Sequence, residues 1–276
     1  MELGEKAAEG LRATPRPRRA NAEGSNAELP HDEVHLWVAD HRGRDDELEG
    51  HSALLDPGER DRASRFRFHK DFRRFVFGHG GLRSILGLYS GGRAEALRIV
   101  RRCEICGSEE HGKPSLLLRS GEPSRIRFSC SYSDQLVVVA VSNGAEIGVD
   151  VERVVAGFEW RQVAETALSS GERSLLDALD GDSAVRAFYE MWTRKEAVSK
   201  ASGRGLEQLT RVDTCGWVYG DDGAFEVFET TGERSWAGKD LELPGHAAAV
   251  AVDGADAREW SVKEVPWDLQ PIGRGA

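Results

Sequence analysis

Two short stretches of the sequence place carboxylates and a lysine at spacings suited to cation binding and proton transfer. In segment 146–153, Asp150 and Glu152 alternate with apolar residues. This alternation predicts a strand with both carboxylates on one face, their carbons about 6–7 Å apart. Two carboxylates at that spacing can share one hard cation. Further along the chain, Glu196 and Lys200 are four residues apart, which predicts an acid and a base on neighbouring turns of one helix face.

The helix that would carry Glu196 and Lys200 is indicated by apolar or aromatic residues at 188, 191, 192, 198 and 201, a periodicity typical of one buried face. Gly203 and Gly205 predict its end, because glycine readily adopts the left-handed conformation at a helix C-terminus. Taken alone, Glu196 and Lys200 also fit a solvated salt bridge worth a few tenths of a kcal/mol.

The two stretches together resemble a known family. Ile-Gly-Val-Asp-Val-Glu at 147–152, followed by Trp-Thr-Arg-Lys-Glu-Ala-Val-Ser-Lys at 192–200, resembles the two signatures of the 4'-phosphopantetheinyl transferases, in their larger, two-lobed, Sfp-like branch. The resemblance covers roughly residues 33–265. It implies that Asp150, Glu152 and Glu196 bind Mg²⁺, with Mn²⁺ as the alternative, since Mg²⁺ takes a few carboxylates together with substrate phosphates.

The reaction implied by the resemblance is transfer of 4'-phosphopantetheine from coenzyme A to a serine of an apo acyl, peptidyl or aryl carrier protein, with release of 3',5'-ADP. Such holo-[acyl-carrier-protein] synthase type enzymes serve fatty acid or secondary metabolite biosynthesis. Glu196 would take the serine proton, and Lys200 would stabilise the leaving phosphate. Two alternatives stay open: a non-catalytic homologue that binds carrier proteins, and a Mg²⁺-dependent hydrolase of coenzyme A or another nucleotide.

Basic residues are the expected contacts for the anionic coenzyme. The densest basic segment lies within 56–75; it also fits a solvated helix face. The resemblance implies that Arg74, with Arg62 as a second candidate, binds the 3'-phosphate and adenine end, where Arg offers bidentate hydrogen bonds. Glu59 stands where the family often has another basic residue. Gly112-Lys113-Pro114 resembles a family turn whose lysine approaches the coenzyme phosphates.

Ser129-Cys130-Ser131 stands where the family usually has Ser-His-Ser. Ser129 and Ser131 still offer hydroxyls to coenzyme phosphate, whereas the neutral thiol of Cys130 is a poor substitute for an imidazole donor. Lys195 lies off the face shared by Glu196 and Lys200, and we expect it to contact phosphate or to be a plain surface charge.

A cysteine- and histidine-containing segment lies outside the motifs that carry the resemblance. Cys103, Cys106 and His111 form a partial metal-binding motif with three candidate ligands. A structural zinc site requires four ligands, so the motif alone is weak support for zinc.

The resemblance implies an α+β fold of two similar lobes with pseudo-twofold symmetry and the active site at their interface. We expect a disordered leader at 1–30, an N-terminal lobe at 31–143, a C-terminal lobe carrying the metal and catalytic residues at 144–267, and a frayed tail at 268–276. Helices are predicted from Asp56 to about Tyr89 and over 160–168 and 170–179. Strands are predicted at 34–38, 126–131, 135–141, 212–218, 224–229, 246–252 and 259–263.

Composition narrows the classes of protein. The 276 residues carry a formal net charge of −10, which argues against a nucleic-acid binder. Because coenzyme A and carrier proteins are both anionic, we expect basic residues to gather locally around the site. No apolar run is long enough for a membrane span, and no apolar signal segment is present. We therefore expect a cytoplasmic protein without membrane or nucleic-acid partners, and a monomer, because the two-lobed branch resembles an internal dimer.

Overall fold

The structure is a computed structural model. It describes residues 27–103, 105–214, 218–219, 224–229, 234–254 and 260–269. Most of the predicted leader, 1–30, and all but two residues of the predicted tail, 268–276, lie outside these ranges. Within the predicted leader, Leu29 is buried in a core cluster that also contains Phe77 and Val139. The Asn143 side chain donates a hydrogen bond to the Leu29 carbonyl at 3.0 Å.

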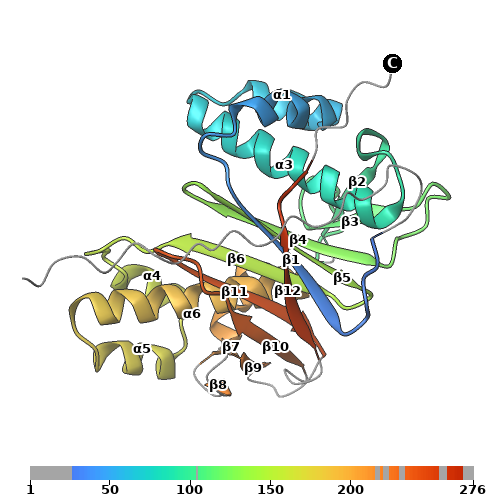
Figure 1. The fold of residues 1–276 in the computed structure, drawn as a ribbon. Coiled ribbons are helices and arrows are strands. Elements are labelled where there is room, and N and C mark those ends of the chain that lie inside the picture. Colours follow the sequence, from blue (N-terminus) through green and yellow to red (C-terminus); the bar gives the residue numbers. More distant parts are fainter. Residues whose placement is uncertain are drawn as a thin grey trace, which may run out of the picture.

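A first sheet is covered by helices on one face (Figure 1). Its strand order is β12 (Ser261–Pro266), β1 (Glu33–Asp40), β5 (Leu136–Asn143) and β4 (Ile126–Ser133). The helices of this half are α1 (Asp45–Leu54), α2 (Pro57–Ser64) and α3 (His69–Ser90), and a short 3₁₀ turn, η1 (Ala94–Ala96), follows. A separate hairpin of β2 (Arg98–Arg102) and β3 (Lys113–Leu117) lies beside them.

The second sheet follows the order β6 (Ile147–Arg153), β11 (His246–Asp253), β10 (Ser235–Asp240), β9 (Ala224–Glu229) and β7 (Val212–Asp213), with β8 (Val218–Tyr219) also paired to β9. Its helices are α4 (Arg161–Ala167), α5 (Ser170–Asp177), the long α6 (Gly181–Ser202) and the 3₁₀ turn η2 (Leu206–Arg211). Helix α6 crosses β6 and β11 (Figure 1).

The alternation of strand residues divides the interior into layers. On β5, Val137 and Val139 face the helices of the first half, whereas Val138 belongs to a cluster shared with the second sheet. On β11, Val250 joins that same shared cluster, while Ala249 packs with α6. Each sheet therefore has one face under its own helices and the other face against the opposite sheet. This arrangement confirms the α+β class; the twofold relation between the halves stays a prediction.

Helix ends follow local sequence rules. Helix α2 begins with a capping box, in which the Asp56 side chain accepts from the Glu59 amide and Glu59 accepts from the Asp56 amide, a pairing that satisfies two amides without helical partners. Helix α6 ends at Gly203, whose φ of 72° is left-handed, as predicted.

Several elements differ from the sequence predictions. Helix α1 and strand β10 were not predicted. Strand β12 was assigned to the C-terminal lobe but pairs with β1 in the first sheet, in parallel. Leu269, which lies in the tail expected to be frayed, is buried in the core under α3 together with Trp267, which was assigned to the C-terminal lobe. Parts of the predicted strands 212–218 and 259–263 lie outside the described residues.

None of the helices within the described ranges combines the length and the apolarity needed to cross a bilayer.

Candidate active site

The two sheets meet where β4 and β6 run side by side, and serine side chains join them. Ser129, Ser131 and Ser133 occupy every second position of β4, so their side chains share one face. Ser129 Oγ accepts from the Val149 amide at 3.0 Å, and Ser133 Oγ accepts from the Arg153 amide at 3.0 Å. Ser129 and Ser133 thus fix the strand that carries Asp150, and Ser129 is one of the two serines predicted to meet coenzyme phosphate.

Asp150 is the most buried carboxylate of the predicted metal site, with 3% exposure. Its Oδ1 accepts from Ser131 Oγ at 2.8 Å and from Lys200 Nζ at 2.6 Å. Within the described part of the chain, its Oδ2 is buried without a hydrogen-bond partner. An unpartnered buried carboxylate oxygen is costly, so this atom favours a ligand that supplies positive charge.

A close approach of α6 to β6 brings Glu196 and Lys200 to the two strand carboxylates. Gly148 lies directly under α6, where an added Cβ would be 1.9 Å from the Ala197 carbonyl oxygen. Only glycine permits this separation. The predicted grouping of Asp150, Glu152, Glu196 and Lys200 therefore depends on the Gly in the Ile-Gly-Val-Asp-Val-Glu stretch.

The carboxylates of Asp150, Glu152 and Glu196 repel one another electrostatically. Burial, followed by the charge of Asp150, raises the pKa of Glu196 to about 7; Lys200 opposes the shift and Glu152 adds to it. Burial and the charge of Asp150 also raise the pKa of Glu152, against a hydrogen bond from Ser133 to its Oε2 at 2.9 Å. A carboxyl with a pKa near neutrality is suited to accept a proton at physiological pH.

A cleft of about 1200 Å³ opens beside Glu196 and Lys200, between the first-half helices, the β2–β3 hairpin and the end of α6. The predicted site residues that line it are Arg62, Lys113, Ser129, Cys130, Glu196 and Lys200. Its volume is sufficient for a large ligand.

Sequence reasoning missed a second group of cations in the cleft. Arg98, Arg101 and Arg102 from β2 line it and are exposed. The sequence contained one signal for this group: three arginines fall within the five residues 98–102. Together with Arg62 and Lys113, they gather basic residues locally in an acidic protein, as expected for an anionic ligand.

Lys113 and Arg62 both interact with neighbouring residues of the protein. Lys113 Nζ donates to the Ala201 carbonyl at 2.6 Å and pairs with Glu146 at 2.5 Å, which connects β3 to the end of α6. Burial lowers the pKa of Lys113, and Glu146 opposes this. The Arg62 guanidinium lies over the Phe75 ring, 5.4 Å from its centroid.

Arg74 lies outside this cleft. It lines a neighbouring hollow of about 480 Å³, donates to Asp71 at 3.1 Å and lies 5.5 Å from the centroid of the Tyr132 ring. The carboxylate of Glu59, where the family often has a base, binds Arg83 Nε at 2.6 Å. The coenzyme role of Arg74 therefore stays a prediction that the cleft alone does not support.

Cys130 points from β4 toward the cleft, on the opposite face from the serines beside it. Burial raises the pKa of its thiol to about 12, although Lys200 and Arg101 act in the other direction. The side chain is thus a neutral thiol at the position of the usual histidine.

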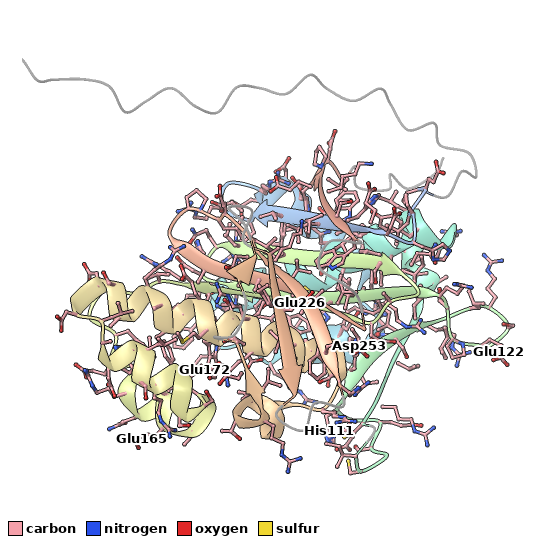
Figure 2. The ribbon with its side chains drawn as sticks, turned by 90° about the horizontal axis from the view of Figure 1, so that it is seen from below. His111, Glu122, Glu165, Glu172, Glu226 and Asp253 are labelled. Carbon is pink, nitrogen blue, oxygen red and sulfur yellow. The ribbon has the colours of Figure 1, made fainter. Side chains whose placement is uncertain are left out.

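The expectation for Lys195 is wrong. It is neither at the surface nor in the cleft: its side chain is fully buried and pairs with Glu172 on α5 at 2.7 Å. Its Nζ also donates to the Val212 carbonyl at 2.6 Å and to the Leu209 carbonyl. Figure 2 shows Glu172 well apart from His111, which marks the hairpin beside the cleft. Lys195 therefore joins α6 to α5 and η2.

The chemistry of the carboxylate group fits Mg²⁺, because all three side chains offer hard oxygens, one buried oxygen is unpartnered and the pKa of two carboxyls is raised. Their spacing is wider than a bound ion requires. Within the described residues, the set of His, Cys, Asp or Glu ligand atoms that all lie within 4.8 Å of one another is that of Cys103, Cys106 and His111. Binding of one ion by all three carboxylates would require their side chains to move closer together and Lys200 to release Asp150 Oδ1.

Comparison with known proteins agrees with this geometry. The sequence pattern of the 4'-phosphopantetheinyl transferase superfamily matches residues 146–252, which hold Asp150, Glu152, Glu196 and Lys200. The 4'-phosphopantetheinyl transferase HetI of Nostoc is 34% identical over 188 residues, which cover 68% of this chain and 76% of HetI.

More distant relatives carry the same activity in their names. The 4'-phosphopantetheinyl transferase gsp of Aneurinibacillus migulanus is 32% identical over 49% of this chain and 54% of its own length. The 4'-phosphopantetheinyl transferase Sfp of Bacillus subtilis is 26% identical over 58% of this chain and 66% of its own. The similarity to HetI extends beyond the motif region, and the chain therefore belongs to the 4'-phosphopantetheinyl transferase superfamily.

Proposed function

We propose that this protein transfers 4'-phosphopantetheine from coenzyme A to a serine of an apo acyl, peptidyl or aryl carrier protein, as a holo-[acyl-carrier-protein] synthase type transferase. The observation that carries the proposal is that Lys200 pairs with the buried Asp150 and lines, together with Glu196, a cleft that also holds arginines and a second lysine. The relatives named for this activity support it.

In the proposed reaction the serine oxygen bonds to the phosphorus nearest the pantetheine, and the bond from that phosphorus to the bridging pyrophosphate oxygen breaks, releasing 3',5'-ADP. Glu196 accepts the serine proton, a role suited to a carboxylate that lines the cleft one helical turn from Lys200. Lys200 lies one helical turn away and places positive charge where the leaving phosphate develops negative charge. The cleft arginines hold the anionic coenzyme.

Asp150, Glu152 and Glu196 are the residues that would hold Mg²⁺ or Mn²⁺. When bound, the ion supplies positive charge that neutralises the pyrophosphate during phosphoryl transfer.

Intact mass spectrometry of an apo carrier protein tests the proposal. After incubation with this protein, coenzyme A and Mg²⁺, we expect a mass gain of one phosphopantetheine that EDTA abolishes. Asp150→Asn and Glu196→Gln should each slow the gain by about 100-fold or more. Arg186→Ala is the control, because Arg186 lies on the same helix in an exposed pair with Glu190.

Two outcomes would replace the proposal. A carrier that binds without any mass gain would identify a non-catalytic carrier-binding protein. Release of 3',5'-ADP without any carrier would identify a hydrolase.

A further inference from the structure

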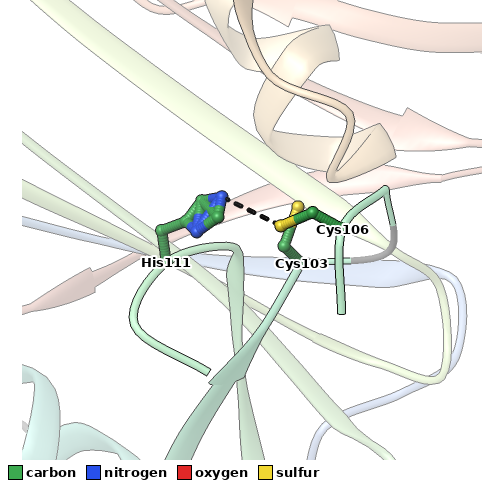
Figure 3. Close-up of side chains that lie close together, drawn as sticks. All are labelled: Cys103, Cys106 and His111. Atoms are coloured by element: carbon green, nitrogen blue, oxygen red, sulfur yellow. Dashed lines mark hydrogen bonds between the residues drawn. The ribbon is translucent and has the colours of Figure 1, made fainter. Parts of the chain in front are cut away.

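The turn between β2 and β3 brings two thiols and one imidazole together (Figure 3), and Arg102 and Gly112 on either side of this turn line the cleft. The ligand atoms of Cys103, Cys106 and His111 all lie within 4.8 Å of one another, and Cys106 Sγ lies 3.5 Å from His111 Nε2. Neither cysteine forms a disulfide. The fold therefore brings the three residues of the partial sequence motif together as a compact Cys₂His cluster.

The backbone of the turn holds the two thiols on the same side. The Cys103 amide donates to the Ser108 carbonyl and the Gly107 amide donates to the Cys103 carbonyl, each at 2.8 Å. Gly107 has a φ of 72°, and Gly112 has a φ of 111° and passes so near Arg102 that an added Cβ would be 2.4 Å from its carbonyl oxygen. Only glycine tolerates both positions without strain.

We propose that this cluster binds one Zn²⁺ through Cys103 Sγ, Cys106 Sγ and His111 Nε2. Two thiolates and one imidazole suit this borderline-soft ion, whereas Mg²⁺ prefers oxygen ligands. Each cysteine releases its thiol proton on binding, so the two thiolate charges neutralise the ion. No fourth His, Cys, Asp or Glu of the described residues joins the 4.8 Å set, and water completes the tetrahedron.

The cluster lies at the turn of the hairpin, away from the end that packs on the rest of the fold. Strands β2 and β3 pair only with each other among the described strands, and Leu116 of β3 is buried in the core under α3, so a metal at the turn would crosslink the end of the hairpin opposite to this anchor. The same hairpin presents Arg98, Arg101, Arg102 and Lys113 to the cleft. Zinc would hold the turn between these strands, so its loss would weaken binding of an anionic ligand without touching Glu196 or Lys200.

Metal content of the purified full chain tests the site without coenzyme A or carrier protein. The protein is reconstituted with Zn²⁺ under reducing conditions and unbound metal is removed. We then expect about one zinc per chain by inductively coupled plasma mass spectrometry. Cys106→Ser and His111→Ala should each lose most of it; both side chains are exposed, so the fold should persist by circular dichroism. Cys130→Ser, which removes a thiol outside the cluster, should retain it.

Cobalt substitution gives a second readout on the unmodified chain. Co²⁺ bound by this cluster should produce the thiolate-to-cobalt absorption of a tetrahedral site, and Cys106→Ser should reduce that absorption by about half or more. Zinc below about a tenth of an ion per chain, without the cobalt band, would overturn the proposal. So would a Cys103–Cys106 disulfide that persists under the reducing conditions. None of these results bears on whether the protein transfers phosphopantetheine.

Discussion

Glu196 combines burial with two acidic neighbours, and this combination raises its pKa to about 7. In the metal-free protein its carboxyl should therefore titrate near pH 7, and Mg²⁺ should move the titration to lower pH, because a cation favours the ionised form. Carbon-13 NMR of labelled glutamate carboxyls measures this directly, with Glu196→Gln identifying the signal. A titration near the ordinary value of 4.5 would contradict the described environment.

The raised pKa of Glu196 also makes the free energy of unfolding depend on pH. Because the folded state holds the Glu196 proton more tightly than the unfolded state does, the contribution of this group is fully present below pH 4.5 and is lost as the pH rises through 7. Glu196→Gln should remove that part of the pH dependence of the free energy of unfolding, measured by urea denaturation between pH 4.5 and 7.5.

Lys195 shows how a charged residue can be structural. Removing one partner of a buried ion pair leaves the other charge uncompensated, so Lys195→Ala should lower the free energy of unfolding by about 3–5 kcal/mol. Arg186→Ala, which breaks the exposed pair with Glu190 on the same helix, should cost only about 0.5 kcal/mol. Equal effects in urea denaturation would contradict the buried pairing of Lys195 with Glu172.

At the level of elements, the active site depends on the contact between β6 and α6 at Gly148. Gly148→Ala forces a methyl group against the Ala197 carbonyl, and such overpacking typically costs about 1–3 kcal/mol or more. Since Asp150 and Glu196 lie on either side of this contact, transferase activity should fall as well. Thermal unfolding and the carrier mass assay measure the two effects.

Gly171→Ala is the matched control for that substitution. Gly171 lies in α5, where an added Cβ would meet its nearest neighbour, Asp213, at 3.4 Å, an ordinary contact. Alanine in place of a helical glycine should be neutral or stabilise by about 0.5–1 kcal/mol. If Gly148→Ala behaved like Gly171→Ala, helix α6 would not lie against β6 as described.

The elements that position the site were the most predictable from sequence. The alternation around Asp150 and the periodicity around Glu196 each report one buried face, and the structure has β6 and α6 there. Helix α1 was missed because its segment, DDELEGHSAL, is mostly polar and shows little apolar periodicity. Strand β10, SWAGKD, contains glycine, lysine and aspartate, which are depleted in strands.

The details that sequence could not supply depend on what packs against each element. Helix α6 is covered by sheet on one side and by α5 on another, so Lys195, off the catalytic face, meets Glu172 rather than solvent. The serines of β4 were predicted from the family to bind a ligand, yet their partners on β6 become apparent only when the sheets are placed together. Side-chain periodicity within one strand does not reveal the neighbour that it faces.

For the whole molecule, the last described strand and the residues that follow it complete the first half of the fold. Strand β12 pairs in parallel with β1, and the buried Trp267 that follows it stacks on Phe77, with ring centroids 5.8 Å apart. Trp267→Ala should lower the free energy of unfolding by about 3–5 kcal/mol. Leu118→Ala, at a side chain 46% exposed, should change it by less than about 0.5 kcal/mol, and similar effects of the two would exclude a core role for Trp267.

The measurement that tests the proposed function most directly is parallel quantification of 3',5'-ADP release and carrier mass gain, with and without an apo carrier protein. Transfer through Glu196 and Lys200 predicts one 3',5'-ADP for each modified carrier, no release without carrier, and loss of both signals in Glu196→Gln. Release of 3',5'-ADP without carrier, or carrier binding without mass gain, would contradict the transferase assignment.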